Sequence, residues 1–100
     1  GGRWEKIYFP YEDTALFVFD VHADDPAHGD IRLTLNTGRQ VPLDPDRLYI
    51  HQDRLYMMLA DEQVKFAERA MIRISKRLEE DARGRLCMDL GGRRHVIPEK

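Results

Sequence analysis

Cysteine is nearly missing from the sequence, which has a single one, Cys87, among 100 residues. One cysteine excludes a disulfide within the chain and a zinc site made of four cysteines. It fits a reducing compartment, so we expect a cytoplasmic protein. Long apolar runs are missing too: stretches such as Ala15–Phe19 are far too short to cross a bilayer, and no membrane association is expected.

Neither sign of charge dominates. Sixteen basic and eighteen acidic residues are interspersed, which gives a formal net charge of −2. A nucleic-acid-binding protein would carry a broad basic surface, so we expect no nucleic acid partner.

Residues typical of nucleophilic catalysis are scarce. Ser75 is the only serine, and no histidine lies at helical distance from it. Asp20 with His22 could act as an acid–base pair in principle, but no pattern indicates a pocket around them. We therefore expect a protein that is not an enzyme and has no cofactor.

The residues that are present indicate one small globular domain over residues 1–100. Hydrophobic residues make up 42% of the chain and charged residues 34%, and the length suffices for a single core. Gly1-Gly2, without an initiator Met, is interpreted as a cloning remnant, and a longer parent protein is compatible with this start.

Alternation of apolar and polar residues predicts several short strands. One face of the strongest strand carries Phe17, Phe19, Val21 and Ala23, and the other carries Leu16, Val18, Asp20 and His22. The predicted strands cover residues 4–9, 15–23, 30–36, 39–43, 47–51, 54–59, 63–66, 85–90 and 93–97.

A single helix is predicted to run to Arg83, with Gly84 at its end. Its start is open between Asp61 and Ala67. The later start is favoured, because residues 63–66 also alternate as a strand. Apolar residues at helical spacing form its inner face: Val64, Ala67, Met71, Ile74 and Leu78. The outer face is expected to be solvated and carries Glu68, Arg69, Arg73, Lys76 and Glu80.

These elements predict an α+β fold. The expected architecture is a curved antiparallel β-sheet meander with one long amphipathic helix packed on one face, followed by a C-terminal β-hairpin. A small barrel closed at one end by the helix is the alternative. The outline is similar to pleckstrin-homology-like modules, but the trailing hairpin departs from it and no motif identifies a family.

The stretch HADDPAHGD, residues 22–30, is a candidate metal site. Its imidazole and carboxylate groups would suit zinc, nickel or manganese, yet the spacing matches no metal-binding signature. Asp, Pro and Gly are also turn formers, so a solvated turn between two strands is favoured. The metal candidates are Asp20, His22, Asp24 and His28.

A second candidate is a face of the strands 47–51 and 54–59. If Leu48, Ile50, Leu55 and Met57 form the core, the opposite face presents Tyr49, His51, Tyr56 and Met58. Aromatic residues and Met are enriched at interfaces, so this face is predicted to bind a partner. The competing interpretation is that it packs under the helix as core.

We expect a small interaction or self-association module, whose partner is another protein or a second copy in a homodimer. The reason is that one helix can shield only one side of a sheet, which leaves the other side to dock elsewhere. The alternative is a regulatory domain that binds a metal or small molecule near His22, His28 and His51.

Overall fold

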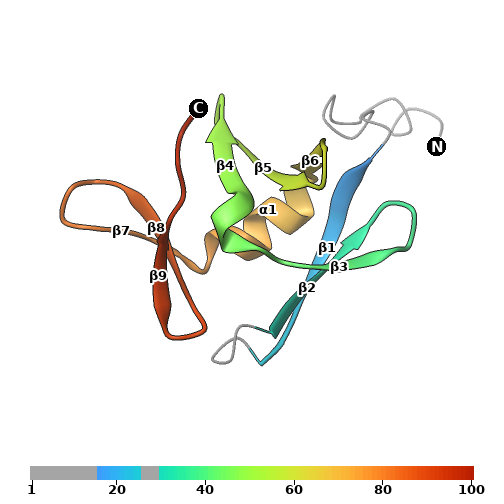
Figure 1. Ribbon diagram of the computed structural model, residues 1–100, viewed down its shortest axis with the longest axis horizontal. Helices are drawn as coiled ribbons and strands as arrows, with labels where there is room; N and C mark the ends of the chain where they lie inside the picture. Colours follow the sequence, from blue (N-terminus) through green and yellow to red (C-terminus); the bar gives the residue numbers. More distant parts are fainter. Residues whose placement is uncertain (1–15, 26–29) are drawn as a thin grey trace, which may run out of the picture.

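The computed structural model of the protein describes residues 16–25 and 30–100, without the side chains of Asp24 and Asp25 (Figure 1). The predicted strand 4–9 lies outside the described residues. In chain order the elements are β1 (Phe17–Asp25), β2 (Asp30–Leu35), β3 (Gln40–Pro42), the 3-10 turn η4 (Pro45–Arg47), β4 (Leu48–His51), β5 (Arg54–Leu59), β6 (Glu62–Phe66), α1 (Glu68–Ser75), β7 (Leu78–Glu80), β8 (Leu86–Leu90) and β9 (Arg93–Val96).

Six strands form a curled sheet in the order β3-β2-β1-β6-β5-β4. Within β1–β3 and within β4–β6, strands that are neighbours in the chain pair antiparallel, as their short links predict. β3 and β4 lie at opposite edges of the sheet, and β1 pairs with β6 in parallel. The prediction of a purely antiparallel meander is therefore wrong, and the sheet is mixed. Link lengths say nothing about β1 and β6, because they are far apart in the sequence.

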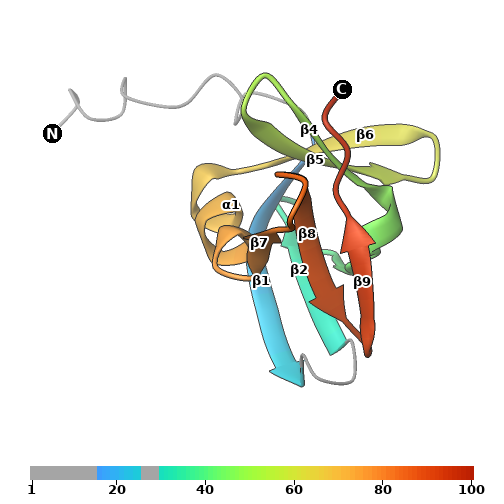
Figure 2. The same cartoon turned by 90° about the vertical axis from the view of Figure 1, so that its left-hand side faces the viewer.

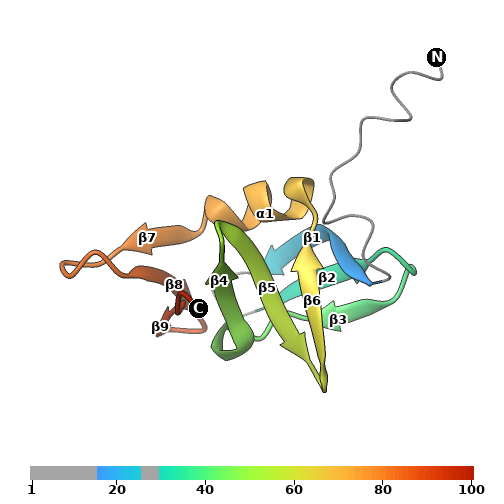
Figure 3. The ribbon, with the colours of Figure 1, turned by 90° about the horizontal axis from the view of Figure 1, so that it is seen from above.

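The parallel pairing of β1 with β6 is very short. It joins Phe17 to Lys65 and Val18 to Phe66, after which the chain leaves the sheet and enters α1. The Ala67 N–H still donates to the Val18 carbonyl at 2.8 Å. From there α1 takes the place beside β1 that a further strand would occupy (Figures 2 and 3).

The helix begins where the sequence favours and ends earlier than predicted. Ala67 is its N-cap residue, but its last residue is Ser75 rather than Arg83. Leu78 starts β7 and lies opposite Met88 of β8. Its spacing of four from Ile74 satisfies a helical stripe and a strand equally, so periodicity could not mark the helix end.

A tight turn closes the β7–β8 hairpin that follows the helix. The Asp81 carboxylate accepts hydrogen bonds from the backbone N–H groups of Arg83 (2.9 Å) and Arg85 (2.8 Å). Gly84, at φ +78°, adopts the left-handed conformation that the turn requires. The predicted C-terminal hairpin is thus part of a three-stranded antiparallel sheet, β7-β8-β9.

A β-bulge changes the faces of β1. Val18 pairs with Leu35 and Asp20 with Thr34, so Phe19 is an extra residue. Val18 and Val21 therefore point into the core together, while Phe19 is 46% exposed. The predicted grouping of Phe19 with Val21 is wrong, because strict alternation fails at a bulge.

Both sheets and the helix contribute to one core. The outer side of β1–β3, by contrast, is polar: His22 Nε2 lies 2.7 Å from Thr34 Oγ1, and Gln40 Nε2 donates to the same hydroxyl. The largest side chains with almost no exposed surface are Phe66, Ile31, Leu33, Leu35, Leu48, Met57, Ile74 and Met88.

A histidine–carboxylate pair joins the second sheet to η4. His95 of β9 is 8% exposed, and its Nδ1 donates to Asp46 Oδ1 at 2.8 Å. This hydrogen bond is the main reason why the pKa of the Asp46 carboxyl lies below its usual value. Asp44 caps η4 by accepting from the Asp46 N–H, which holds the carboxylate towards β9.

Replacing Ile74 by Ala should lower the free energy of unfolding by about 2–5 kcal/mol, because the side chain is completely buried. Ile72→Ala is the matched control on the same helix, where the side chain is 51% exposed, and should cost less than about 0.5 kcal/mol. Urea unfolding followed by circular dichroism measures both losses. Equal losses would show that α1 does not pack as described.

Asp46→Asn should make stability less dependent on pH. A carboxyl whose folded pKa is lowered stabilises the fold above its unfolded pKa of about 3.9. That contribution is lost as the pH falls through the lowered pKa. The urea midpoints of the wild-type and variant proteins should therefore differ at pH 5–7, roughly, and converge below about pH 3. A difference that stays constant across this range would contradict the role of the His95 hydrogen bond.

Candidate functional site

The candidate metal ligands are engaged elsewhere in the described part of the structure. Asp20 is only 14% exposed and lies 3.4 Å from Arg69 Nη2 and 3.3 Å from Arg73 Nε. His22 is hydrogen-bonded to Thr34 across the β1–β2 pair. The two side chains share the outer face of β1, as predicted, but each has its own partner there.

The histidines of the alternative hypothesis are not brought together in the described residues. His22 is on β1, whereas His51 is on β4, at the far edge of the sheet, where its Nδ1 donates to the Lys100 carbonyl at 2.7 Å. His28 and the side chain of Asp24 lie outside the described residues. Within residues 16–23 and 30–100, no three His, Cys, Asp or Glu side chains are placed to hold a metal ion.

The predicted partner-binding face of β4 and β5, which we call the tyrosine face, consists of Tyr49, His51, Tyr56 and Met58, and its two tyrosines form a closed cluster. Tyr49 and Tyr56 lie opposite each other on β4 and β5, with ring centroids 5.3 Å apart and planes within 8°. They are 7% and 5% exposed. Lysine ammonium groups lie over both rings, Lys100 at 4.9 Å from Tyr49 and Lys65 at 5.7 Å from Tyr56. Burial raises the pKa of the Tyr49 hydroxyl, and Tyr56 adds to the shift.

Leu48, Leu55 and Met57 are core residues, as predicted for the other side of these strands. The tyrosines belong neither to that core nor to an open surface. His51 is exposed and Met58 is half-buried, so a partner would meet these two first. Partner binding through Tyr49, His51, Tyr56 and Met58 stays a prediction.

A different surface gathers exposed apolar and positively charged side chains on α1. Residues 69, 72, 73 and 76 recur at helical spacing and lie on one side of the helix. Phe19 extends this surface from the bulge of β1, because the Arg69 guanidinium lies 5.4 Å from its ring centroid. We call the following set the cationic face: Phe19, Arg69, Ile72, Arg73, Lys76 and Arg77.

The charges of the cationic face are unevenly compensated. Asp20 pairs with both Arg69 and Arg73 and so ties the helix to β1. Lys76 and Arg77 make no ion pair with the described residues, and neither does Glu68 at the other end of the helix. The two unpaired cations therefore lie together at the C-terminal end of α1.

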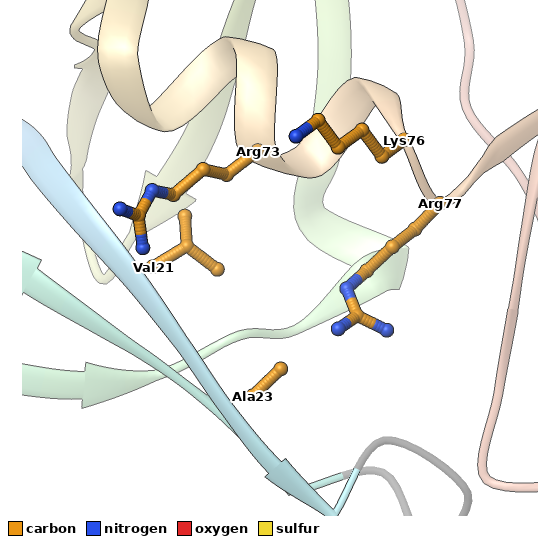
Figure 4. A pocket seen from close by; sticks show the side chains of 5 residues that line it. All are labelled: Val21, Ala23, Arg73, Lys76 and Arg77. Atoms are coloured by element: carbon orange, nitrogen blue, oxygen red, sulfur yellow. The ribbon is translucent and has the colours of Figure 1, made fainter.

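A groove of about 520 Å³ lies beside these cations. Arg73, Lys76 and Arg77 line it on the helix side, and Val21 and Ala23 of β1 line it on the sheet side (Figure 4). The guanidinium groups of both arginines reach towards β1. The groove is open to solvent, so a ligand could enter it without a conformational change.

Sequence reasoning missed the cationic face because it made the helix too long. A helix that continues to Glu80 adds acids to the same surface as its cations and is expected to be a solvated, mixed-charge surface. In the structure, Glu79 and Glu80 belong to β7, and Glu79 Oε2 lies 3.2 Å from Arg94 of β9. The signal that could have located the end is the turn sequence, in which Asp81 and Gly84 close a hairpin.

Comparison with known proteins gives no match to a family model, to a curated protein or to a solved structure. Among residues 16–25 and 30–100, no helix has both the length and the apolar character needed to cross a membrane.

Proposed function

We propose that the protein is a small non-enzymatic domain that binds an acidic segment of a partner protein through the cationic face. The observation that carries the proposal is the combination of exposed apolar and cationic side chains on one side of α1. Phe19, Ile72 and Val96 are the large hydrophobic residues with high exposure in the described part, and two of the three lie on this face.

Binding rather than catalysis is supported by how the potential nucleophiles are used. The Ser75 hydroxyl donates to the Ile72 carbonyl at 2.7 Å, which is a bond within the helix. Cys87 is buried at 1% exposure, away from the groove. Neither side chain is presented to a ligand with a neighbouring general base.

An acidic segment with apolar side chains complements this face best. Four cations face two acids, Asp20 and Glu68, on a protein whose overall charge is −2. Opposite charge steers a partner to the face, and burial of Ile72 and Phe19 would supply the contact energy. The surface is small, so we expect an affinity in the roughly micromolar range.

A second copy of the chain fits the same face less well. A two-fold symmetric dimer brings one patch against the same patch, which would place the arginines and lysine of both copies side by side. Like charges across an interface oppose association. The charge of the face therefore favours a different protein over self-association.

Binding to the cationic face can be tested with a fluorescently labelled peptide that repeats Asp-Phe-Glu-Leu. Fluorescence anisotropy measures the affinity of the protein for this peptide. Ile72→Glu should weaken binding about fivefold or more, because it removes an apolar contact and adds a repelling charge. Val96→Glu is the matched control, since Val96 is 42% exposed but lies on β9. It should change the affinity less than about twofold.

Light scattering measures the mass of the same proteins in solution and so shows whether the cationic face binds a second copy of the chain. The proposal expects a monomer whose binding of the acidic peptide depends on Ile72. A stable dimer that Ile72→Glu dissociates would replace the partner by a second copy and overturn the proposal. Equal effects of Ile72→Glu and Val96→Glu on peptide binding would also overturn it.

A further inference from the structure

We infer that the groove between the end of α1 and β1 is a binding site for a phosphate monoester, carried by a small soluble molecule or by a lipid headgroup. The site consists of Arg73, Lys76 and Arg77 above the apolar side chains of Val21 and Ala23 (Figure 4). The site shares these three cations with the cationic face, but it takes a different ligand, and Phe19 and Ile72 do not line the groove.

The charge balance of the groove suits a doubly charged anion. Arg73 is partly neutralised by Asp20 at 3.3 Å, whereas Lys76 and Arg77 have no acidic partner among the described residues. A phosphate monoester carries a charge of about −1.5 to −2 at pH 7, close to the sum of these two cations. A single carboxylate would leave one of them uncompensated.

The types of donor also favour phosphate. Arginine offers a planar fork of N–H groups that matches two phosphate oxygens, and lysine adds a compact point charge. Figure 4 shows the guanidinium groups of Arg73 and Arg77 reaching towards β1, whereas the Lys76 side chain extends along the helix towards Arg73. An anion in the groove can therefore be held by two guanidinium groups, with the charge of Lys76 nearby.

Cations at the end of a helix have a simpler explanation, which is interaction with the last carbonyl groups. Two of these carbonyls already have donors in this helix. The Ile74 carbonyl accepts from the Arg77 backbone N–H at 2.8 Å, and the Ile72 carbonyl accepts from the Ser75 hydroxyl. The side chains of Lys76 and Arg77 make no hydrogen bond to the described residues and stay available to a ligand.

The size of the groove indicates more than a bare phosphate ion. Its volume of about 520 Å³ lies in the range of small-molecule sites. Val21 and Ala23 provide an apolar wall on the β1 side, against which an organic group attached to the phosphate can pack. A phosphate monoester should therefore bind more tightly than inorganic phosphate.

The test uses phenyl phosphate as the probe, with inorganic phosphate and acetate for comparison, in calorimetric titrations of the whole chain at constant ionic strength. Phenyl phosphate should bind most tightly and acetate not measurably. The double variant Lys76→Gln/Arg77→Gln should raise the Kd for phenyl phosphate about tenfold or more. Arg39→Gln/Arg83→Gln removes the same charge from two exposed arginines outside the groove and should change it less than about twofold.

Vesicles distinguish the two sources of the phosphate. One set contains phosphatidylcholine with a phosphatidylinositol monophosphate, and the other contains phosphatidylserine at equal total charge. Binding to phenyl phosphate without a preference for the first vesicles assigns a soluble ligand. A preference for the first vesicles that Lys76→Gln/Arg77→Gln abolishes assigns the headgroup.

Two results would overturn the inference: no binding of either phosphate probe, or losses that the Arg39/Arg83 control variant reproduces. Thermal unfolding of each variant excludes loss of the fold as the cause. Ile72→Ala separates this site from the proposed partner site, because it removes an apolar contact of the cationic face without placing a carboxylate four residues before Lys76. It should weaken binding of the acidic peptide and leave phenyl phosphate binding intact, so the two proposed sites can fail independently.

Discussion

The parallel pairing of β1 with β6 lasts for only two residues, yet it joins the two halves of the large sheet, β3-β2-β1 and β6-β5-β4. A strand edge that is left unpaired needs cover, because its backbone groups would otherwise be free to pair with another chain. The chain supplies that cover itself: it leaves β6 at Phe66 and continues directly into α1 beside β1. Ala70 and Ile74 then complete the core, and Asp20 binds two arginines of the helix.

The same arrangement separates the charges of the helix. Asp20 pairs with Arg69 and Arg73, while Lys76 and Arg77 line the groove with Arg73 and make no ion pair with the described residues. Because α1 stops at Ser75, Glu79 pairs with Arg94 of β9 and Asp81 with Arg85 of the β7–β8 turn, instead of with these cations. An ordinary mixed-charge segment of sequence thus becomes a surface with local positive charge on a protein that is acidic overall.

Local patterns predict local structure well in this chain. The strands predicted over residues 30–36 and 39–43 and the helix start near Ala67 are all confirmed. The predictions that failed concern contacts between residues that are not neighbours in the sequence, namely the parallel β1–β6 pair and the pairing of Leu78 with Met88. The prediction of the face that carries Phe19 failed for another reason. One extra residue at a bulge reverses the faces of a strand, and the composition of the strand does not reveal it. The tyrosine face shows the same limit: its position opposite the core was predictable, but its cover by Lys65 and Lys100 was not.

Both proposed sites require α1 to end at Ser75, so that the acids after Arg77 leave the helix. Backbone chemical shifts measured by nuclear magnetic resonance report the length of this helix. We expect helical shifts that end at Ser75, followed by strand shifts over Leu78–Glu80 and contacts between Leu78 and Met88 across the β7–β8 pair. Helical shifts that continue to Glu80, without those contacts, would return acidic side chains to the cationic face and rule out both sites as described.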